Sequence, residues 1–428
     1  MTQAITHPHH LSARRHDLDA IRIGAFALLI LYHIGMFYVP WGWHVNSTRP
    51  QEWLQPLMWF TNPWRMTLLF LVSGAATRLL YEAYRRQGTG AAERLGGARL
   101  SRLGLPLLFG MFVIVPPQSY YQVLEMARTG ALLSGLSPEA ATVGFWAQYA
   151  TADGQWCTAE ECLITPTWNH LWFLAYVLVY GLLAAMVAGV ASHRFGAWAK
   201  RLEAVLKGPW LFILPIAYLA AIRIGLYPLF PVTHDFVQDL YTHVLSLMAF
   251  GFGFLLVDAP RLTERLIRYR HLSLILALAS YAVFVSYMML YPEGVEPSPL
   301  LRNIMRGVYA VDQWTFIAAI LGYAGRHVHG TSPLMKYLGG GIFTFYMVHQ
   351  TLIVVTAVHV ENLKLPLALE MGIVLTLTCA GCVLAYEVAR RMGVFGVLLG
   401  ASAKASPSHQ SDKPSSSGRS PVILSDPA

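Results

Sequence analysis

Long apolar segments alternate with short polar or basic connectors over residues 19–400. An α-helix rises about 1.5 Å per residue, so about 20 apolar residues cross the hydrocarbon core of a bilayer, which is about 30 Å thick. The pattern therefore predicts an all-α integral membrane protein with about ten transmembrane helices in one membrane domain. The expected spans lie near residues 19–40, 59–81, 106–117, from 170, 209–230, 241–257, 272–291, 303–323, from 339 and 366–389.

Three stretches stand outside this alternation. Residues 1–18 are polar and rich in histidine and are expected to form a flexible arm, and the Ser- and Pro-rich residues 401–428 are expected to be a disordered tail. The connector 118–169 is too long for a simple link, which indicates a structured or functional outer loop. A disulfide would join its Cys157 and Cys162 if the loop faces an oxidising compartment. The cysteine pairs lack the partners expected of a zinc site, so no metal site is expected.

The charge of the chain agrees with a membrane protein and gives its orientation. Only 13% of the residues are charged, against about 25% in a typical soluble domain. Lys and Arg total 31 against 23 Asp and Glu, and most of them fall on alternate connectors, on the side that holds both termini. This asymmetry predicts that both termini are cytoplasmic. Because topology accounts for the basic excess, we expect no binding to nucleic acid.

The first apolar segment carries Arg22 and His33, eleven positions apart. On a helix this spacing places His33 about 16 Å from Arg22 on nearly the same face, close to the middle of the bilayer. An ionisable side chain at that depth normally faces protein or water and marks function, although an intramembrane histidine can also serve only to hold helices together. A second intramembrane histidine, His349, is expected at similar depth and favours the functional interpretation. An imidazole is suited to taking a proton from a hydroxyl.

Other candidate residues have two interpretations each. Arg99 and Arg102 stand at the cytoplasmic mouth of the third segment, where they either bind phosphates in a bidentate manner or only enforce topology, and spacing alone favours topology. Ser73, next to Gly74, supplies either a hydroxyl or a close helix contact. Glu387, near the end of the last segment, forms either a ligand contact or a structural ion pair.

Three further residues need an explanation. Asp312 is an acid in the middle of the eighth segment and requires a partner. Trp43 and Trp172 are most simply explained as interfacial tryptophans, and their rings are also suited to stacking on sugar rings at the outer mouth.

Six motifs in this order resemble those of the acyltransferase-3 family of integral membrane acyltransferases, over about residues 15–400. Singly they are weak, but their order on a ten-span chain makes the resemblance fairly specific. The motifs are Arg22-x10-His33, Phe70-x-x-Ser73-Gly74, Arg99-x-x-Arg102-Leu-x-x-Pro106, His170-Leu-Trp-Phe-Leu174, Thr344-Phe-Tyr-Met-Val-His349 and Tyr386-Glu387.

The resemblance implies transfer of an acyl group, acetyl or succinyl, from cytoplasmic acyl-coenzyme A to hydroxyls of a periplasmic glucan or other cell-envelope carbohydrate. It implies a multi-pass protein of the bacterial inner membrane, with the lipid bilayer around it, the glucan synthesis machinery as a candidate partner and no bound cofactor. In this interpretation His33 acts as general base or acyl carrier. The implied catalytic residues are His33, Arg22 and His349; the donor contacts are Arg99, Arg102, Ser73, Arg65 and Glu387; the acceptor contacts are Tyr346, Trp172 and Trp43.

Two alternatives to an acyltransferase remain at this point. A proton-coupled transporter would use His33, Asp312 and His349 as a relay, and it predicts inverted repeats, which the sequence does not show. A non-catalytic protein that anchors a polymer-synthesis complex would need neither histidine for chemistry.

Overall fold

The computed structural model describes residues 15–292 and 294–401. These residues form α-helices with short 3₁₀ and π-helical segments, and none of them lies in a β-strand. Helix α1 (His16–Tyr38) begins inside the arm expected at 1–18. The rest of that arm, residues 1–14, and the expected tail from residue 402 onward lie outside the described residues.

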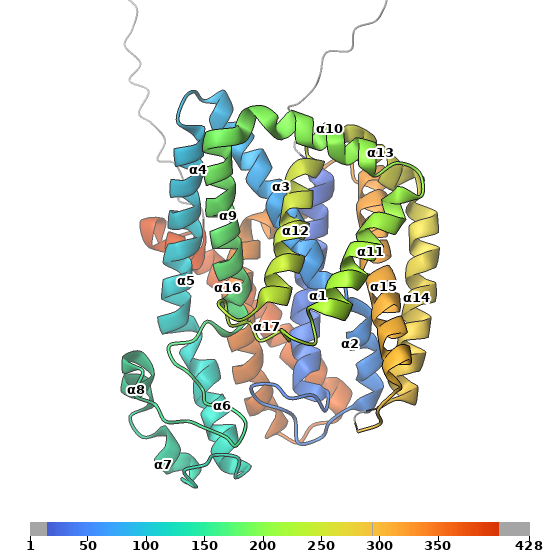
Figure 1. The fold of residues 1–428 in the computed structure, drawn as a ribbon. Helices are drawn as coiled ribbons and strands as arrows, with labels where there is room; N and C mark the ends of the chain where they lie inside the picture. Colours follow the sequence, from blue (N-terminus) through green and yellow to red (C-terminus); the bar gives the residue numbers. More distant parts are fainter. Residues whose placement is uncertain (1–14, 293, 402–428) are drawn as a thin grey trace, which may run out of the picture.

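The remaining α-helices follow one another with connectors of varied length (Figure 1). They are α2 (Gln55–Thr61), α3 (Arg65–Arg86), α4 (Ala91–Arg99), α5 (Leu105–Phe109), α6 (Pro116–Arg128), α7 (Pro138–Thr142), α8 (Phe145–Thr151), α9 (Trp172–Ala191), α10 (Phe195–Val205), α11 (Trp210–Gly225), α12 (Leu240–Leu256), α13 (Pro260–Arg268), α14 (Arg270–Leu290), α15 (Pro299–His327), α16 (Pro333–Glu361) and α17 (Leu367–Ala389).

Within the described residues, six helical segments are long and apolar enough to cross a membrane. A seventh is added if α12 and α13, which meet at a bend of 105°, form one span. Helix α11 is apolar but only 16 residues long, and α3 and α15 have the length but a more polar composition. The six segments are His16–Tyr38, Ala91–Arg128, Asn169–Val205, Arg270–Leu290, Pro333–Glu361 and Leu367–Ala389. The all-α membrane class is therefore confirmed, and the number ten stays a prediction.

The third expected span was wrong in its bounds. Instead of a short helix at 106–117 after a basic loop, one helical segment runs over 38 residues from Ala91 to Arg128. It contains two π-helical segments, Leu100–Gly104 and Gly110–Ile114. Its prolines stand just after these segments, at the first positions of α5 and α6. There they interrupt a hydrogen-bond ladder that the π-helical geometry has already altered, so they do not end the helix.

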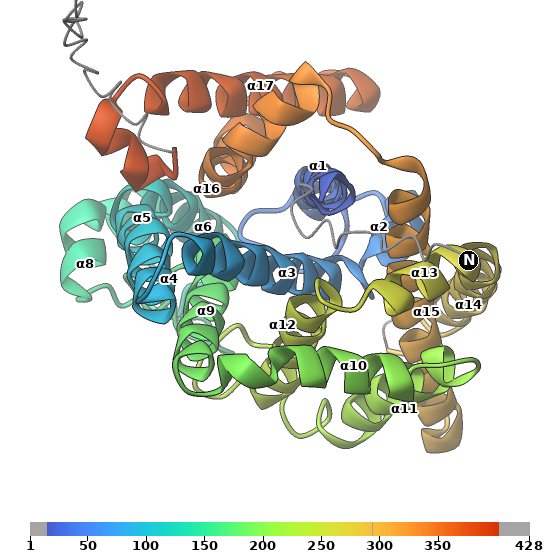
Figure 2. The ribbon, with the colours of Figure 1, turned by 90° about the horizontal axis from the view of Figure 1, so that it is seen from above.

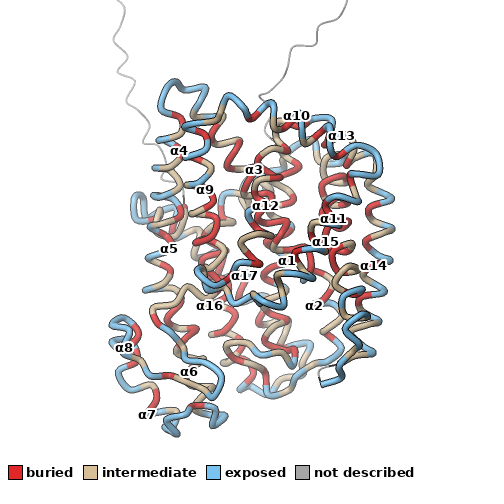
Figure 3. The backbone as a smooth tube through the Cα atoms, viewed as in Figure 1, coloured by how far each residue is buried: buried red, intermediate tan, exposed pale blue. Residues whose placement is uncertain are grey.

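Helix α1 lies inside the bundle (Figure 2), where it packs against α16, α15 and α3. In α16, 61% of an 18-residue apolar stretch is buried, against 22% of the corresponding stretches in α14 and α17. Helix α16 is therefore interior, and the other two present apolar faces outward. Figure 3 shows the same contrast between buried inner and exposed outer surfaces. Helix α10 lies across one end of the bundle, and α7 and α8 lie at the opposite end (Figure 1).

The connector before α9 is a structured unit, although α6 takes up the first residues of the expected loop 118–169. It has its own buried cluster, which includes Phe145, Tyr149 and Trp156, and a disulfide joins Cys157 to Cys162. The Tyr149 hydroxyl donates a hydrogen bond to the carbonyl of Met111 at 2.9 Å. This unit is therefore fixed to the bundle at the end opposite α10.

Helices α3 and α12 cross at two glycines, which explains Gly74 as a packing residue. A Cβ atom at Gly74 would lie 1.9 Å from the carbonyl oxygen of Phe250, and one at Gly253 would lie 1.8 Å from that of Leu71. Both obstacles are backbone atoms, which cannot rotate away. Small residues at such crossings let helix backbones approach closely.

Gly74→Ala is therefore expected to destabilise the fold by about 1–3 kcal/mol, the usual cost of overpacking. Thermal unfolding in detergent should show a lower midpoint for this variant. Gly251→Ala on α12 is the matched control, because a Cβ atom there would meet nothing within 4 Å. Equal midpoints for the two variants would contradict the close crossing.

Candidate active site

One large cavity connects the two ends of the bundle. Its volume is about 2060 Å³, and its walls include Arg22 and Arg99, then His33, and then Trp43 and Glu160. Arg22 follows the start of α1, and Arg99 ends α4. Glu160 follows α8 in the connector before α9, and α7 and α8 lie at the end of the bundle opposite α10 (Figure 1). The cavity wall that includes His33 therefore extends toward both ends of the bundle.

His33 and His349 form a hydrogen-bonded pair between α1 and α16. His33 Nδ1 lies 2.9 Å from His349 Nε2, and the two ring centroids are 5.1 Å apart. Nearer the start of both helices, Arg22 Nη2 donates to the carbonyl of Gly339 at 3.2 Å. Because the two contacts are separated by eleven residues on α1 and ten on α16, the helices run side by side in the same direction.

The hydrogen bonds determine which nitrogen of each ring carries the proton when both rings are neutral. His349 Nδ1 lies 2.8 Å from the carbonyl oxygen of Tyr346, and a carbonyl only accepts, so Nδ1 is the protonated nitrogen. His349 Nε2 is then an acceptor and receives the Nδ1 proton of His33. The remaining nitrogen, His33 Nε2, carries a lone pair on a side chain that lines the cavity. The arrangement leaves a proton acceptor on a residue of the cavity wall.

A third histidine, His170, lies against this pair. Its ring centroid is 5.1 Å from that of His349, its Nε2 donates to the carbonyl of Met347 at 3.1 Å, and its own carbonyl accepts from the Tyr346 hydroxyl at 2.6 Å. His170 was not predicted as a site residue, although it opens one of the six motifs. Within the described residues, no group of three or more His, Cys, Asp or Glu is placed to hold a metal ion.

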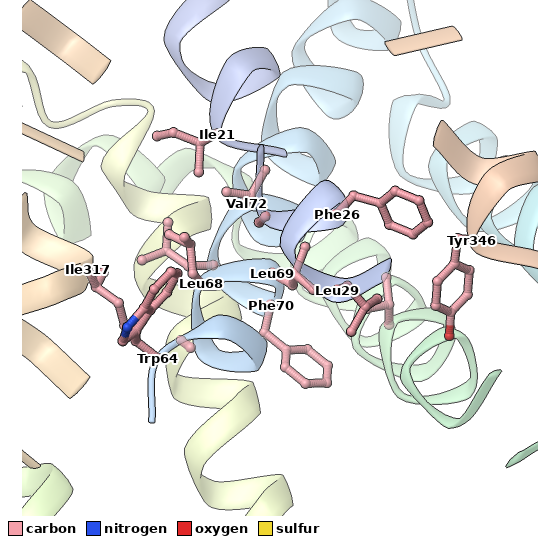
Figure 4. Close-up of a cluster of buried hydrophobic side chains, with 14 of the residues drawn as sticks. Ile21, Phe26, Leu29, Trp64, Leu68, Leu69, Phe70, Val72, Ile317 and Tyr346 are labelled. Carbon is pink, nitrogen blue, oxygen red and sulfur yellow. The ribbon is translucent and has the colours of Figure 1, made fainter. Parts of the chain in front are cut away.

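Apolar side chains enclose the buried partner of the pair. The Phe26 ring lies 5.5 Å from the His349 ring and 6.2 Å from the Tyr346 ring. Figure 4 shows Phe26 and Leu29 projecting from α1 toward Tyr346. His349 itself is 0% exposed. Of the two rings of the pair, only that of His33 therefore belongs to the cavity wall.

A braced loop holds Trp43 over His33. The two rings are nearly parallel, at 14°, with centroids 6.4 Å apart. The Trp43 amide donates to Asn46 Oδ1 at 3.1 Å, and Ser47 Oγ donates to buried Glu361 at 2.7 Å. These bonds tie the loop to the end of α16, so the indole is positioned beside the imidazole.

Trp172 also lines the cavity. Its ring stacks on that of His234, with centroids 4.1 Å apart and planes 24° apart. The structure thus brings Trp43, Trp172 and Tyr346 to one cavity with His33, as expected for residues that contact an acceptor.

Arg99, Arg102 and Ser73 line the part of the cavity nearer α10. Arg99 Nη2 donates to Thr77 Oγ1 at 2.7 Å, and its side chain lies against Gly181, where a Cβ atom would be 3.0 Å from Arg99 Cδ. Arg102 is exposed. Neither arginine forms an ion pair with a described residue, so both charges are available to an anion.

Two predicted donor contacts lie elsewhere. Arg65 is 4% exposed, and its guanidinium carbon stands 3.5 Å from the centroid of the Tyr32 ring, beside His33 rather than beside Arg99. Glu387 does not line the cavity; it pairs with Arg390 at 2.9 Å and accepts from the Tyr337 hydroxyl at 2.9 Å. The ion-pair interpretation of Glu387 is the one that the structure supports.

Asp312 is also absent from the cavity wall. It is 0% exposed, and neither of its carboxylate oxygens has a hydrogen-bond partner among the described residues. Of the three groups in the hypothetical proton relay, only His33 and His349 are in contact.

A family model described as an acyltransferase domain matches residues 15–387. This chain belongs to the acyltransferase-3 family. The matched region holds the histidine pair and the arginines of the cavity, and the acyltransferase-3 assignment agrees with the several apolar helices of a multi-pass membrane protein.

Curated relatives of this acyltransferase-3 chain are glucan biosynthesis proteins. Glucans biosynthesis protein C of Salmonella schwarzengrund (strain CVM19633) is 28% identical over 224 residues, which cover 49% of each chain. The proteins of that name from Salmonella heidelberg (strain SL476) and Salmonella paratyphi B (strain ATCC BAA-1250 / SPB7) are 27% identical over the same length. The chain thus spans about half the length of the curated relatives that it matches. No solved structure matches it.

Proposed function

We propose that this protein is a membrane-bound O-acyltransferase. It transfers a short acyl group, succinyl or acetyl, from acyl-coenzyme A to hydroxyls of a periplasmic glucan or another cell-envelope carbohydrate. The single observation that carries the proposal is the continuous cavity, with His33 on its wall and aromatic rings toward one end. Toward the other end it holds Arg99 and Arg102, neither of which forms an ion pair with a described residue. The names of the curated relatives support a glucan as acceptor.

The donor enters at the end that holds Arg99 and Arg102. Coenzyme A carries several phosphate oxygens, which guanidinium groups bind through charge-assisted, often bidentate hydrogen bonds. Ser73 lines the same region. Arg22, eleven positions before His33 on α1, belongs to this donor end and is not assigned to the chemical step.

His33 acts as the general base. Its Nε2 takes the proton of the acceptor hydroxyl while that oxygen attacks the thioester carbonyl. The tetrahedral intermediate then collapses, the carbon–sulfur bond breaks, and the leaving thiolate receives the proton from His33. The products are the carbohydrate ester and free coenzyme A. Because one cavity reaches both ends, donor and acceptor meet at His33 together, and no acyl-enzyme is needed.

The membrane setting of this reaction follows the charge pattern. We propose that the protein lies in the bacterial inner membrane with about ten spans, and its basic connectors favour cytoplasmic termini. The arginine end then faces the cytoplasm, where acyl-coenzyme A is made, and the end with Trp43 faces the periplasm. A glucan synthesis machinery on that side is the natural source of the acceptor.

The proposal is tested with purified protein in lipid vesicles. Labelled acyl-coenzyme A and a neutral glucan oligosaccharide are supplied, and the labelled ester is separated and weighed by mass spectrometry. Ester formation that requires the protein is the expected result. No ester with either acetyl or succinyl donor, on any of several glucans, would contradict the proposed function.

Arg99→Gln is expected to raise the KM for acyl-coenzyme A about tenfold or more, since one charge-assisted hydrogen bond contributes about 1.5–3 kcal/mol. The kcat should change little, because Arg99 is assigned to the phosphates of the donor and not to the chemical step. The matched control is Arg94→Gln on the same helix α4, which is exposed and does not line the cavity. A donor KM equal to that of the control would contradict the assigned phosphate contact.

A further inference from the structure

A second pair of arginines lines the cavity away from the donor end. Arg223, in the last turn of α11, lines the wall and donates from Nη1 to the Tyr241 hydroxyl at 3.1 Å. Its guanidinium carbon lies 3.3 Å from the centroid of the Tyr309 ring. The ring holds the cation by its face and leaves the edge of the guanidinium available to a ligand.

Arg65 occupies the neighbouring position toward His33. It lines the same cavity, donates from Nη1 to Thr61 Oγ1 at 2.9 Å and stacks on Tyr32, the residue before His33. Its Nε atom is buried without a partner among the described residues. Arg65, Arg223 and Tyr309 therefore all belong to the wall of one cavity.

The described part of the chain supplies no counter-ion for either of them. Neither Arg65 nor Arg223 is in any ion pair between described residues. Asp312, one turn beyond Tyr309 on α15, bonds to neither of them, because both of its carboxylate oxygens are without partners. Buried cations are costly in a membrane protein unless an anion or water compensates them. Two guanidinium groups that line one cavity without a counter-ion among the described residues form an incomplete anion site.

We propose that Arg65 and Arg223, with Tyr309 and Tyr241, form a subsite that binds a carboxylate of the substrate beside His33. The inference rests on the proposed acyl transfer and adds a specificity determinant to it. A carboxylate suits a site of this composition, since its two oxygens accept charge-assisted hydrogen bonds from guanidinium groups. The carboxylate belongs either to the far end of the acyl group or to an anionic substituent of the acceptor.

The experiment compares substrates that differ only in a carboxylate. The donors are succinyl-coenzyme A and butyryl-coenzyme A, whose acyl chains both have four carbons. The acceptors are a neutral glucan oligosaccharide and the same oligosaccharide bearing a carboxymethyl group. The vesicle assay gives kcat/KM for each pair with wild type, Arg223→Gln and Arg223→Lys, and with Arg306→Gln as control. Arg306 lies on α15 with Tyr309, bonds to Asn303 and does not line the cavity.

Wild type and the Arg306→Gln control are expected to prefer a carboxylate-bearing substrate by about tenfold or more. A preference between donors assigns the carboxylate to the acyl group, and a preference between acceptors assigns it to the carbohydrate. Arg223→Gln should remove that preference while leaving transfer between uncharged substrates unchanged, and Arg223→Lys should retain part of it. The rise in the thermal unfolding midpoint with each donor alone measures donor binding in the absence of turnover.

Two results would overturn this inference while leaving the proposed function intact. One is transfer by wild type with equal kcat/KM for charged and uncharged substrates of both kinds. The other is a preference that Arg223→Gln leaves unchanged. Absence of transfer with every donor–acceptor pair would instead contradict the proposed function. In that case, equal thermal stabilisation by succinyl-coenzyme A and butyryl-coenzyme A would count against a carboxylate site for the acyl group.

Discussion

Replacing His33 by alanine is expected to lower kcat for acyl transfer by about 10³-fold, within the range of 10²–10⁴ that positioned general bases contribute. The variant lacks the only imidazole nitrogen of the histidine pair that faces the cavity, so the acceptor hydroxyl keeps its proton during attack. The KM for acyl-coenzyme A should stay nearly unchanged, because the donor end lies about 16 Å away along α1. Steady-state rates in the vesicle assay measure both quantities.

The matched control for this variant is His329→Ala. His329 is exposed on the connector between α15 and α16 and should be dispensable. Both variants should insert in the membrane and elute as wild type does. A His33→Ala protein that is folded and retains more than about a tenth of the wild-type kcat would fall outside the expected range and would remove His33 from the mechanism.

Replacing His349 by leucine is expected to lower kcat by about 100-fold, at the lower end of the same range, although His349 touches no substrate. Leucine fills similar space but accepts no hydrogen bond, so the Nδ1 proton of His33 loses its acceptor and the ring loses its fixed tautomer. Glutamine has an amide oxygen that reaches the place of Nε2, and His349→Gln should recover a substantial part of kcat. Donor KM should be unaffected in both variants.

Rescue by glutamine separates positioning from packing. A purely structural role would make both variants equally poor in stability and in rate, since His349 is fully buried. Equal kcat values for His349→Leu and His349→Gln at equal thermal stability would show that the hydrogen bond to His33 does not matter.

The sequence predicted those features that depend on a single helix face or a single run of apolar residues. The all-α class follows from runs of about 20 apolar residues. The Arg22 and His33 column follows from helical spacing, and the structure places both on one cavity. The meeting of His33 with His349 could be expected only as similar depth, because the choice of α16 as the neighbour of α1 depends on packing over the whole bundle.

Other features depend on tertiary contacts that leave no local signal. The helix from Ala91 to Arg128 passes through prolines that normally end a helix, since π-helical segments precede them. Arg65 opens α3 and turns to Tyr32, which its neighbours in sequence do not indicate. Glu387 pairs with basic residues three and four positions later, a local pattern that could have identified it as structural.

The most direct test of the central claim is mass spectrometry of periplasmic and surface glycans from cells that have or lack this gene. The proposed function predicts that deletion removes a fixed acyl mass per modified sugar, that wild type restores it, and that His33→Ala does not. That mass also distinguishes acetyl from succinyl. The glycans could instead be identical in the parent strain, the deletion strain and the two complemented strains, or His33→Ala could restore the acyl mass fully. Either result would contradict acyl transfer through His33.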